Sequence, residues 1–454
     1  MNILVVGCGK VGQTIVQQLS KEKHDISVID VDAGVVSDMT NAYDVMGVVG
    51  NGESYEVLRA ADIESADLMI AVTDSDEKNL LSCLLAKQVA GCNTIARVRN
   101  PIYGGEIRLI KEALGLSMTV NPEYAAAREI GRLLKVPSAI KVETFCRGRI
   151  ELLKANVMEG SILDGCALVD VDAKIGIDVL ICVVERGDEV VIPKGDFVLQ
   201  KGDRISAVMA TEKVPAFFTS IGESSRPVRN VMLIGGGKIA YYLADSLHKS
   251  GMTIKIIEKD PARCTELAEK LPGCIVIEGD AADQEVLLEE GIAEMDAVVT
   301  LTGIDEENIF LSLYAKSISK GKIITKITRL SFDNIVDGLD LGSVVYPKKI
   351  TAESIVRFVR AMQNSYGSNV ETLYNLIENK VEALEFVVRE MADYVDVPLA
   401  ELERKDNVLV AAIWRNGENI QPNGRTRIQV GDSVIVVTTQ KGIDNLNELF
   451  HKKA

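Results

Sequence analysis

The strongest constraint on the fold is that the chain contains the same unit twice. Residues 1–222 align with residues 229–454 of the 454-residue sequence. The segment ILVVGCGKVG at 3–12 recurs as VMLIGGGKIA at 231–240, an offset of 228. The end of the unit is repeated as well, because IPKGDFVLQKGDRISAV recurs as QPNGRTRIQVGDSVIVV. A repeat of this length decides the architecture before any motif is interpreted, so we expect two copies of one unit.

Each copy begins with short apolar runs that alternate with segments of helical period. This pattern is typical of a parallel sheet covered by helices on both faces. A helical stretch then runs to about Leu134, and after it the pattern changes to short strands with one short helix. The predicted fold class is α/β, with tandem Rossmann-like doubly wound sheets, each followed by a small α+β subdomain. In the first copy, we expect the strands of the sheet near residues 3–6, 26–29, 45–49, 68–72, 94–98 and 118–120.

The same change of pattern sets the expected domain boundaries. Prolines and a serine-rich turn between the copies predict a linker. The order along the chain is therefore large, small, linker, large, small. The five expected segments are the Rossmann-like subdomains 1–134 and 229–362, the small subdomains 135–219 and 363–454, and the linker 220–228.

A glycine-rich turn follows the first predicted strand. Gly7, Gly9 and Gly12 form a GxGxxG pattern that opens a helix, and Asp30 follows at the end of the second strand. In this context the pattern predicts a dinucleotide site, because the glycines let the backbone approach a pyrophosphate and the helix N-terminus attracts its charge. Asp30 would accept hydrogen bonds from the adenosine ribose and repel a 2′-phosphate, so we expect NAD(H) rather than NADP(H).

The second copy repeats this pocket with changes. Ala240 replaces the third glycine and Glu258 replaces the aspartate, so we expect a second pocket with a different affinity or ligand preference. A decayed pocket kept as scaffold stays an alternative. In both copies, polar residues follow the strands at the edge where open α/β sheets hold ligands. They are Asn51, Gly52, Thr73, Asp74 and Arg97 in the first copy, and Asp280, Ala281 and Thr302 in the second. Arg97 could contact phosphate or form a surface ion pair.

Composition excludes several function classes. The 66 acidic and 50 basic residues give a net charge of -16, which disfavours nucleic-acid binding. Gln13 stands where the phosphate-binding lysine of a P-loop would be, so nucleotide hydrolysis is not expected. No apolar run approaches the ~18 residues that span a bilayer and no signal peptide precedes the first strand, so we expect a cytoplasmic protein. The eight cysteines lack CxxC spacing, and the three histidines lie apart from any metal-ligand cluster.

The small subdomains lack the residues that a dehydrogenase needs. Neither supplies a histidine, a lysine–tyrosine pair or a cysteine nucleophile in a suitable context for proton transfer beside a nicotinamide. We therefore expect a protein that senses a nucleotide and is not an enzyme. The alternative is an NAD-dependent oxidoreductase with an unrecognised catalytic module.

Several segments together resemble one family. MNILVVGCGKVG, GNGES, AVTDSDEKN, ARVRNP and VIPKGDFVLQKGDRI, with their repeats, are similar to the TrkA family of potassium-uptake regulatory proteins. Members of that family are built from two RCK (regulator of potassium conductance) units. The resemblance covers essentially the whole chain, and the duplicated glycine motif with both tails is specific to this arrangement.

The resemblance implies a cytosolic gating subunit that lies against the inner face of a membrane potassium channel or transporter of the TrkH/TrkG type. It also implies binding of NAD(H), and of ATP or ADP, and assembly into a ring, with a homotetramer expected. A regulator of a different cation channel remains open. Carried over by position, the first site comprises Gly7, Cys8, Gly9, Lys10, Val11, Gly12, Asp30, Asn51, Gly52, Thr73, Asp74 and Arg97, and the second comprises Gly235, Gly236, Gly237, Lys238, Ile239, Glu258, Asp280, Ala281 and Thr302.

Overall fold

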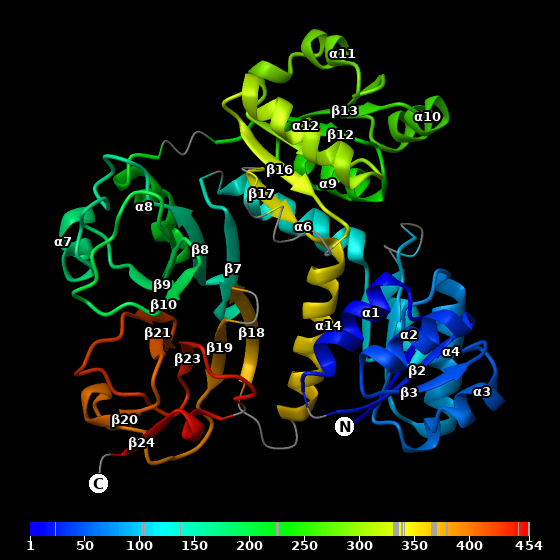
Figure 1. Cartoon of the computed structure of the whole chain (residues 1–454), viewed down its shortest axis with the longest axis horizontal. Helices are drawn as coiled ribbons and strands as arrows, with labels where there is room; N and C mark the ends of the chain where they lie inside the picture. The colour runs from blue at the N-terminus through cyan, green and yellow to red at the C-terminus, as the bar shows by residue number, and fades with distance from the viewer. Residues whose placement is uncertain are drawn as a thin grey trace.

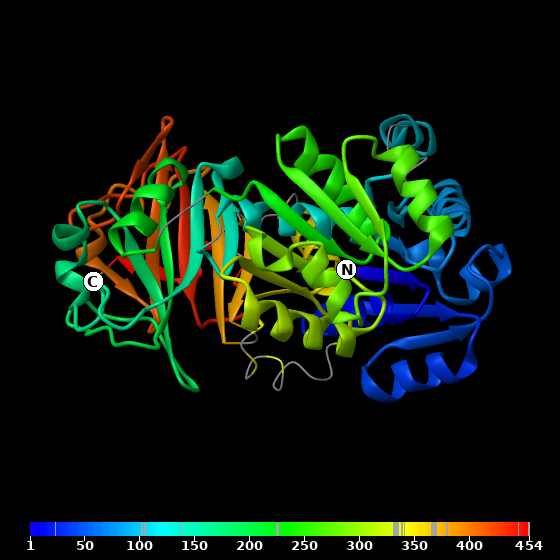
Figure 2. The ribbon, with the colours of Figure 1, turned by 90° about the horizontal axis from the view of Figure 1, so that it is seen from above.

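The chain forms four lobes, two of them α/β and two mainly β (Figure 1). The two α/β lobes lie together on one side of the molecule and the two β-rich lobes lie together on the other, in both views (Figures 1 and 2). The computed structural model describes residues 1–22, 24–100, 106–136, 138–223, 227–329, 341–364, 370–377, 380–443 and 445–452, with Tyr103, Val336 and Leu339.

The first α/β lobe contains a six-stranded parallel sheet in the order β3-β2-β1-β4-β5-β6. This is the doubly wound Rossmann order, in which the chain reverses direction across the sheet between β1 and β4. All six strands predicted from the sequence are confirmed to within one residue at each end. The elements are β1 (Asn2–Val6), α1 (Lys10–Leu19), β2 (Asp25–Asp30), α2 (Ala33–Ala42), β3 (Met46–Val49), α3 (Tyr55–Ala60), β4 (Leu68–Ala71), α4 (Asp76–Ala90), β5 (Asn93–Arg97), α5 (Ile107–Leu114), β6 (Met118–Val120) and α6 (Pro122–Lys135).

The second α/β lobe repeats this topology, with its strands in the order β14-β13-β12-β15-β16-β17. Its central strand β12 is flanked by β13 and β15, as β1 is flanked by β2 and β4. The duplicated doubly wound fold is therefore confirmed. The elements are β12 (Asn230–Ile234), α9 (Lys238–Lys249), β13 (Thr253–Glu258), α10 (Pro261–Lys270), β14 (Ile275–Glu278), α11 (Gln284–Glu289), β15 (Ala297–Thr300), α12 (Asp305–Ile318), β16 (Lys322–Lys326), β17 (Ser343–Val345) and α14 (Pro347–Asn364).

The two small lobes are built on antiparallel sheets in the orders β10-β9-β11-β8-β7 and β18-β19-β23-β21-β22. In the first of these lobes, strands β7 and β10 and one of the two short helices were not predicted from the sequence. The first lobe contains β7 (Lys141–Phe145), β8 (Ile150–Asn156), α7 (Val171–Ile175), β9 (Leu180–Arg186), β10 (Glu189–Val191), β11 (Arg204–Ala210) and α8 (Val214–Ser220). The second contains β18 (Val370–Ile377), β19 (Val381–Val387), β20 (Leu402–Arg404), β21 (Val408–Arg415), β22 (Glu418–Ile420), β23 (Ser433–Thr438) and β24 (Phe450–Lys452).

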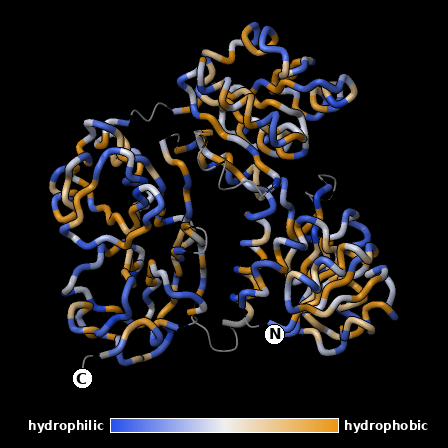
Figure 3. Tube along the Cα trace, viewed as in Figure 1, coloured by the Kyte–Doolittle hydropathy of each residue, from blue (hydrophilic) through white to orange (hydrophobic). Residues whose placement is uncertain are grey.

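The sheets of the two small lobes pack against each other. One buried cluster combines Phe145 and Val183 of the first lobe with Val381 and Ile435 of the second. The rings of Phe145 and Tyr374 meet edge to face with their centroids 5.0 Å apart. Apolar residues follow the strands at the centre of every lobe (Figure 3), and among the described residues no helix has both the length and the apolar character that crossing a membrane requires.

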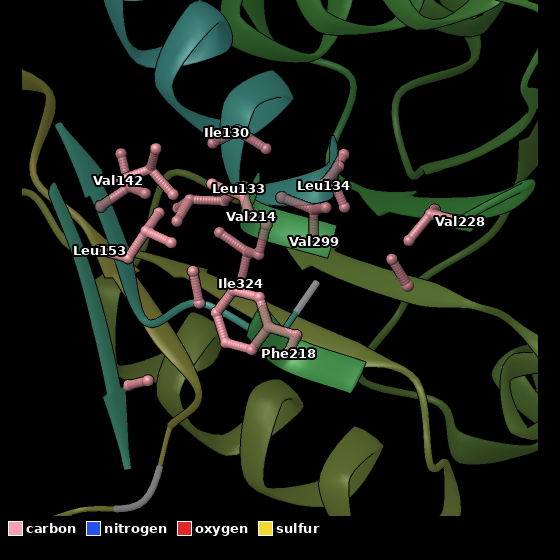
Figure 4. Packing of buried hydrophobic residues seen from close by; sticks show 14 of the residues in the cluster. Ile130, Leu133, Leu134, Val142, Leu153, Val214, Phe218, Val228, Val299 and Ile324 are labelled. Atoms are coloured by element: carbon pink, nitrogen blue, oxygen red, sulfur yellow. The ribbon is translucent and has the colours of Figure 1, made fainter. Parts of the chain in front are cut away.

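Helix α6 leaves the first α/β lobe and packs on the second. Its residues Ile130 and Leu133 belong to a buried cluster that includes Leu243 of α9 and Val299 of β15. Figure 4 shows Ile130 and Leu133 close to Val299 and to Val142 of β7. Helix α6 therefore joins three lobes at once.

Helix α14 makes the reciprocal contact. Its residues Ile355 and Val359 are buried with Ile15 of α1 in the core of the first α/β lobe, and Figure 1 shows the two helices side by side. The guanidinium of Arg360 donates to the carboxylate of Glu22 at 2.9 Å through Nε. Each copy thus contributes a helix that packs against the α/β lobe of the other copy. The expected boundaries at residues 134 and 362 stay predictions, because the helices that end there contribute to both copies.

In each small lobe, an arginine–aspartate pair holds the turn before the central strand. Asp203 and Asp432, which lie in the turns before β11 and β23, are only 1% and 0% exposed. The guanidinium of Arg186 donates to both carboxylate oxygens of Asp203, at 2.8 and 2.7 Å. Arg415 holds Asp432 in the same way, at 2.7 and 2.7 Å. These bidentate pairs fix the entry into β11 and β23.

Candidate nucleotide sites

Two glycines of the first loop lie so close to neighbouring backbone atoms that no other residue fits at their positions. Gly7 has φ +91°, and its N–H donates to the carbonyl of Ile29 at 2.9 Å. A Cβ on Gly7 would lie 2.7 Å from the backbone nitrogen of Thr73, and a Cβ on Gly12 would lie 2.0 Å from the carbonyl oxygen of Gly7. The loop is therefore pressed between β4 and the start of α1, as a dinucleotide-binding turn requires.

The middle of the loop faces open space. A Cβ on Gly9 would meet no atom within 4 Å. Gly9 is also the N-cap of α1, no side chain caps this terminus, and the first turn carries no acidic residue. The N–H groups of the first turn, which includes Lys10 and Val11, are left for an external acceptor. This donor set fits the pyrophosphate of a dinucleotide.

Asp30 sits at the end of β2 as predicted. One carboxylate oxygen accepts from the N–H of Cys8 at 2.6 Å, and the other accepts from the N–H of Asp32 at 3.0 Å. The side chain is only partly buried, so its remaining lone pairs can accept ribose hydroxyls. Burial, and then the charge of Asp30, raise the pKa of the Cys8 thiol to about 12, so Cys8 is a packing residue and not a nucleophile.

The other predicted residues of the first site lie at the carboxyl edge of the sheet. Asn51 is held by Glu53, whose carboxylate accepts from its amide at 2.9 Å. Gly52 packs so tightly that a Cβ there would be 2.2 Å from Cγ1 of Val6. Asp74 is exposed beside Thr73. The topology therefore brings together the residues that the sequence predicted separately.

The sequence missed the residue that organises this edge. Asn79 is fully buried, and its side-chain oxygen accepts from both the N–H and the hydroxyl of Thr73 at 2.7 Å. Its amide donates to the carbonyl of Arg97 at 2.9 Å. Asn308 makes the matching bonds to Thr302 and Lys326 in the second copy. The match of Asn79 with Asn308 in the repeat was the available signal.

Arg97 is neither a solvated surface residue nor an ion-pair partner within the part of the chain that the structure describes. It is partly buried, and its guanidinium donates to the carbonyl of Thr73. Burial, followed by the nearby charge of Arg99, lowers its pKa to about 10, so it stays a cation at neutral pH. Its buried Nε has no hydrogen-bond partner. The carboxylates of Glu123, Asp76 and Asp74 offset part of its charge, and a cation at this edge is suited to contact a phosphate.

The second pocket has the same plan. Gly235 has φ +101°, and the N–H of Gly236 donates to the carboxylate of Glu258 at 2.6 Å. A Cβ on Gly237 would meet no atom within 4 Å, and this residue is the N-cap of α9, whose first turn contains Lys238 and Ile239. The cradle for a phosphate is thus present in both copies.

Around this cradle the second pocket differs in chemistry. Asp280 caps a turn by accepting from the N–H of Ala282 at 2.9 Å, and Ala281 is buried. Arg263 of α10 donates through Nε to the carbonyl of Gly236 at 2.7 Å. Arg263 was not predicted to contribute, because the equivalent position in the first copy is Val35, outside any motif.

The carboxyl edge of the first sheet touches helices of the second copy. The hydroxyl of Tyr242, on α9, accepts from the amide of Asn121 at 3.1 Å and donates to the carbonyl of Arg99 at 3.2 Å. On the other side, burial first and then the charge of Lys10 lower the pKa of Lys348 to about 8. Since Lys10 begins α1 and Lys348 lies in the first turn of α14, the first pocket borders a helix of the second copy.

Solved structures confirm that this combination of lobes is a known fold class. A structure of the GsuK RCK domain matches with a TM-score of 0.60 over 97% of this chain and 92% of that one, at 18% identity. A structure of the GsuK channel bound to NAD matches with a TM-score of 0.61 over 97% of this chain and 77% of that one, also at 18% identity. At this identity the likeness extends to the fold, which is that of a chain with two RCK-type units.

Family models and relatives narrow this class. The TrkA-N domain matches residues 3–122 and 231–347, and the TrkA-C domain matches residues 152–222 and 383–451. The Trk system potassium uptake protein TrkA homolog of Archaeoglobus fulgidus is 34% identical over 451 residues, 99% of this chain and 100% of the relative. The Trk system potassium uptake protein TrkA of Haemophilus influenzae is 31% identical over 459 residues, 100% of this chain and 99% of the relative. The chain belongs to the TrkA family.

Proposed function

We propose that this protein is a nucleotide-sensing regulatory subunit of a potassium uptake system. The observation that carries the proposal is the presence of two complete phosphate cradles in one chain of the TrkA family. The cradles adjoin helices that run into the other copy, and the one cysteine in the first loop is buried with a raised pKa. Such a pocket is suited to transmit binding and offers no group for proton transfer beside a nicotinamide.

The ligand we propose is NAD(H), with ATP or ADP as further ligands. Asp30 and Glu258 each stand where an acidic residue accepts the ribose hydroxyls and repels a 2′-phosphate. The GsuK channel, which shares the fold, has been solved with NAD. The residues predicted from the sequence, from Gly7 to Arg97 and from Gly235 to Thr302, would form the two pockets.

The partner we propose is a membrane potassium channel or transporter of the TrkH/TrkG type, contacted at the inner face of the membrane by a cytoplasmic ring. Exposed apolar residues on α4 and α12 support self-association, because isolated monomers seldom leave large apolar side chains in rows on a helix. Leu81 and Val89 of α4 are 44% and 37% exposed, and Phe310 and Leu313 of α12 are 72% and 37% exposed. A homotetramer would give a closed ring.

Binding can change the ring only by as much as the affinities of its two conformations differ. A pyrophosphate on the first loop would pull on the N-terminus of α1, and α1 is packed against α14. Helix α14 in turn precedes the second small lobe. The route from a pocket to a small lobe therefore crosses from one copy to the other.

Potassium flux through reconstituted channel tests the proposal. Asp30→Ala should abolish the response to NADH at the first site, whereas Asp38→Ala, an exposed acid of α2 with no role in the pocket, should leave it unchanged. An unaltered nucleotide response in the Asp30 variant, with binding at the first pocket lost, would contradict a sensing role for that pocket.

The alternative function, an NAD-dependent oxidoreductase, has its own test. Pure protein is incubated with NADH and a panel of carbonyl substrates, and the nicotinamide absorbance is followed. Stoichiometric binding without steady loss of absorbance is expected. Continuous turnover that is removed by Asp30→Ala would overturn the regulator proposal.

A further inference from the structure

The second small lobe contains a cavity that the repeat does not explain. Its volume is about 250 Å³, and it lies between the loop that follows β19 and the end of the chain at β24. In the first copy the corresponding end of the chain is the helix α8, whereas here β24 pairs with β20. The polar and aromatic lining residues are Glu390, Asp393, Tyr394, Asn447, Phe450 and His451.

One carboxylate of this cavity lacks the cation that its counterpart in the first copy has. Val157 and Val388 are equivalent, because each donates its N–H to the carbonyl of the turn aspartate that precedes the next strand. Counting from them, Glu390 matches Glu159, whose carboxylate is paired with Lys201 at 3.0 Å. Val430 stands where Lys201 would be, and within the described ranges neither Glu390 nor Asp393 has an ion pair.

A tyrosine that lines the cavity has a buried ring and a hydroxyl without a hydrogen-bond partner among the described residues. Tyr394 is 2% exposed and lines the cavity, yet its hydroxyl makes no hydrogen bond to any described residue. In the first copy its position is taken by Leu163, and that of Asp393 by Ile162. Two positions that are apolar in the first copy are therefore polar here, and the Tyr394 oxygen opens into the cavity, where a ligand could replace water as its partner.

We propose that this cavity binds a small organic ammonium ion, such as an aliphatic diamine. An ammonium group would donate to Glu390, Asp393 and the Tyr394 oxygen, and the Phe450 and Tyr394 rings offer faces for a cation. Two carboxylates repel anionic ligands, so the nucleotides of the α/β lobes do not fit. The described residues contain no group of three metal-ligating side chains suited to an ion, which favours an organic cation.

Titration calorimetry on the full-length protein tests this, with 1,4-diaminobutane as the probe. Saturable binding is expected, weakened about tenfold by Glu390→Gln because a charge-assisted hydrogen bond is lost. The matched variant Glu159→Gln, at the equivalent site of the first copy, should bind as the wild type does. Tyr394→Phe, which removes only the hydroxyl, should weaken binding several-fold, and Asp393→Ile, which restores the residue of the first copy, should also weaken it.

Two controls separate this site from its alternatives. Each variant must keep wild-type NADH binding and an unchanged thermal midpoint, which shows that the lobe is folded. Absence of saturable diamine binding, equal weakening by Glu390→Gln and Glu159→Gln, or full displacement of the diamine by equimolar potassium chloride would each overturn the proposal. Stronger binding of succinate than of the diamine would overturn it as well.

Discussion

The two nucleotide pockets share a backbone and differ in the side chains around it. In both, an acid at the end of the second strand accepts an N–H of the glycine loop at 2.6 Å. The adenosine end of the first pocket has the exposed apolar residues Val31 and Val49, whereas the second has Lys259 and Glu278 at these positions. The hydrogen bonds that shape the loop are thus the same in both copies while the side chains around it differ, and we propose that the two pockets prefer different ligands.

The third glycine position shows how the loop itself diverged. A Cβ on Gly12 would collide with the carbonyl of Gly7, yet Ala240 occupies the same place in the second copy and is fully buried. The start of α9 must therefore stand farther from its loop than the start of α1 does. The first loop depends on close packing, and the second is held in part by Arg263.

The largest expected effect tests the difference between the two glycine loops. Gly12→Ala should lower the free energy of unfolding by about 3 kcal/mol and abolish binding in the first pocket, because the loop has no room for a methyl group. The reverse change in the other copy, Ala240→Gly, should cost about 1 kcal/mol, the usual penalty for glycine in a helix. Urea unfolding and NADH calorimetry measure both. Equal losses for the two variants would show that the loops do not differ.

The next effect concerns the two acids. Asp30→Ala should weaken NADH binding at the first pocket by about 10- to 100-fold, because a charged hydrogen-bond acceptor is removed from loop and ribose. Glu258→Ala should do the same at the second pocket only. Calorimetry on each variant should then show one class of site. Two undisturbed classes in either variant would contradict the assignment of that acid.

A feature that both copies retain should respond equally in both. Asp203→Asn and Asp432→Asn each break a bidentate pair and should cost about 2 kcal/mol, a value reduced by the partial exposure of the arginines. Thermal unfolding of each variant provides the measurement. If only one of the two variants lost stability, the arginine–aspartate pair of the other lobe would contribute nothing to stability.

The stability of the protein at low pH should depend on Asp203. Burial alone would raise the pKa of Asp203, but the hydrogen bonds from Arg186 and the N–H of Gln200 outweigh it and hold the pKa below its usual value. The stabilisation is therefore complete above about pH 4 and is lost as the pH falls through the folded pKa. Wild-type stability should drop below about pH 4 more steeply than that of Asp203→Asn. Parallel pH profiles would contradict this.

The smallest effect concerns the rim of the second pocket. Arg263→Val installs the residue of the first copy and should change nucleotide affinity at the second pocket by about two- to fivefold, because one partly exposed cation is lost. The reciprocal Val35→Arg should shift the first pocket toward the second. Higher salt should shrink both differences. Salt-independent effects would argue for a packing role.

Much of the fold and of the first site could be predicted from the sequence, because the signals lie in short stretches of the chain. The strands of the first α/β lobe were predicted to within a residue because each is a short apolar run between turn signals, and the repeat extended the fold to the second copy. Gly7 and Asp30 were found because their spacing is set by one strand, one helix and one strand. Strand β7 was missed because KVETF has only two apolar residues among five.

The parts that could not be predicted are long-range. The apolar face of α6 predicts that the helix is buried, but it does not identify the surface that buries it. The contact with α9 could therefore be found only in the structure. The roles of Asn79 and Arg263 likewise depend on which loops the sheet brings together. The shared position of Asn79 and Asn308 was visible in the repeat, whereas the carbonyl groups that they bond belong to strands many residues away.

The exchange of α6 and α14 has a consequence for how such a chain could arise. A chain that ended near residue 222 would leave the apolar faces of α1 and α6 uncovered, and a second identical chain would cover both. The duplicated protein is thus equivalent to a symmetric dimer whose subunits have been fused. Fusion replaces a concentration-dependent association by a linker of fixed length. It also lets one half mutate without the other, which a dimer of identical chains cannot do.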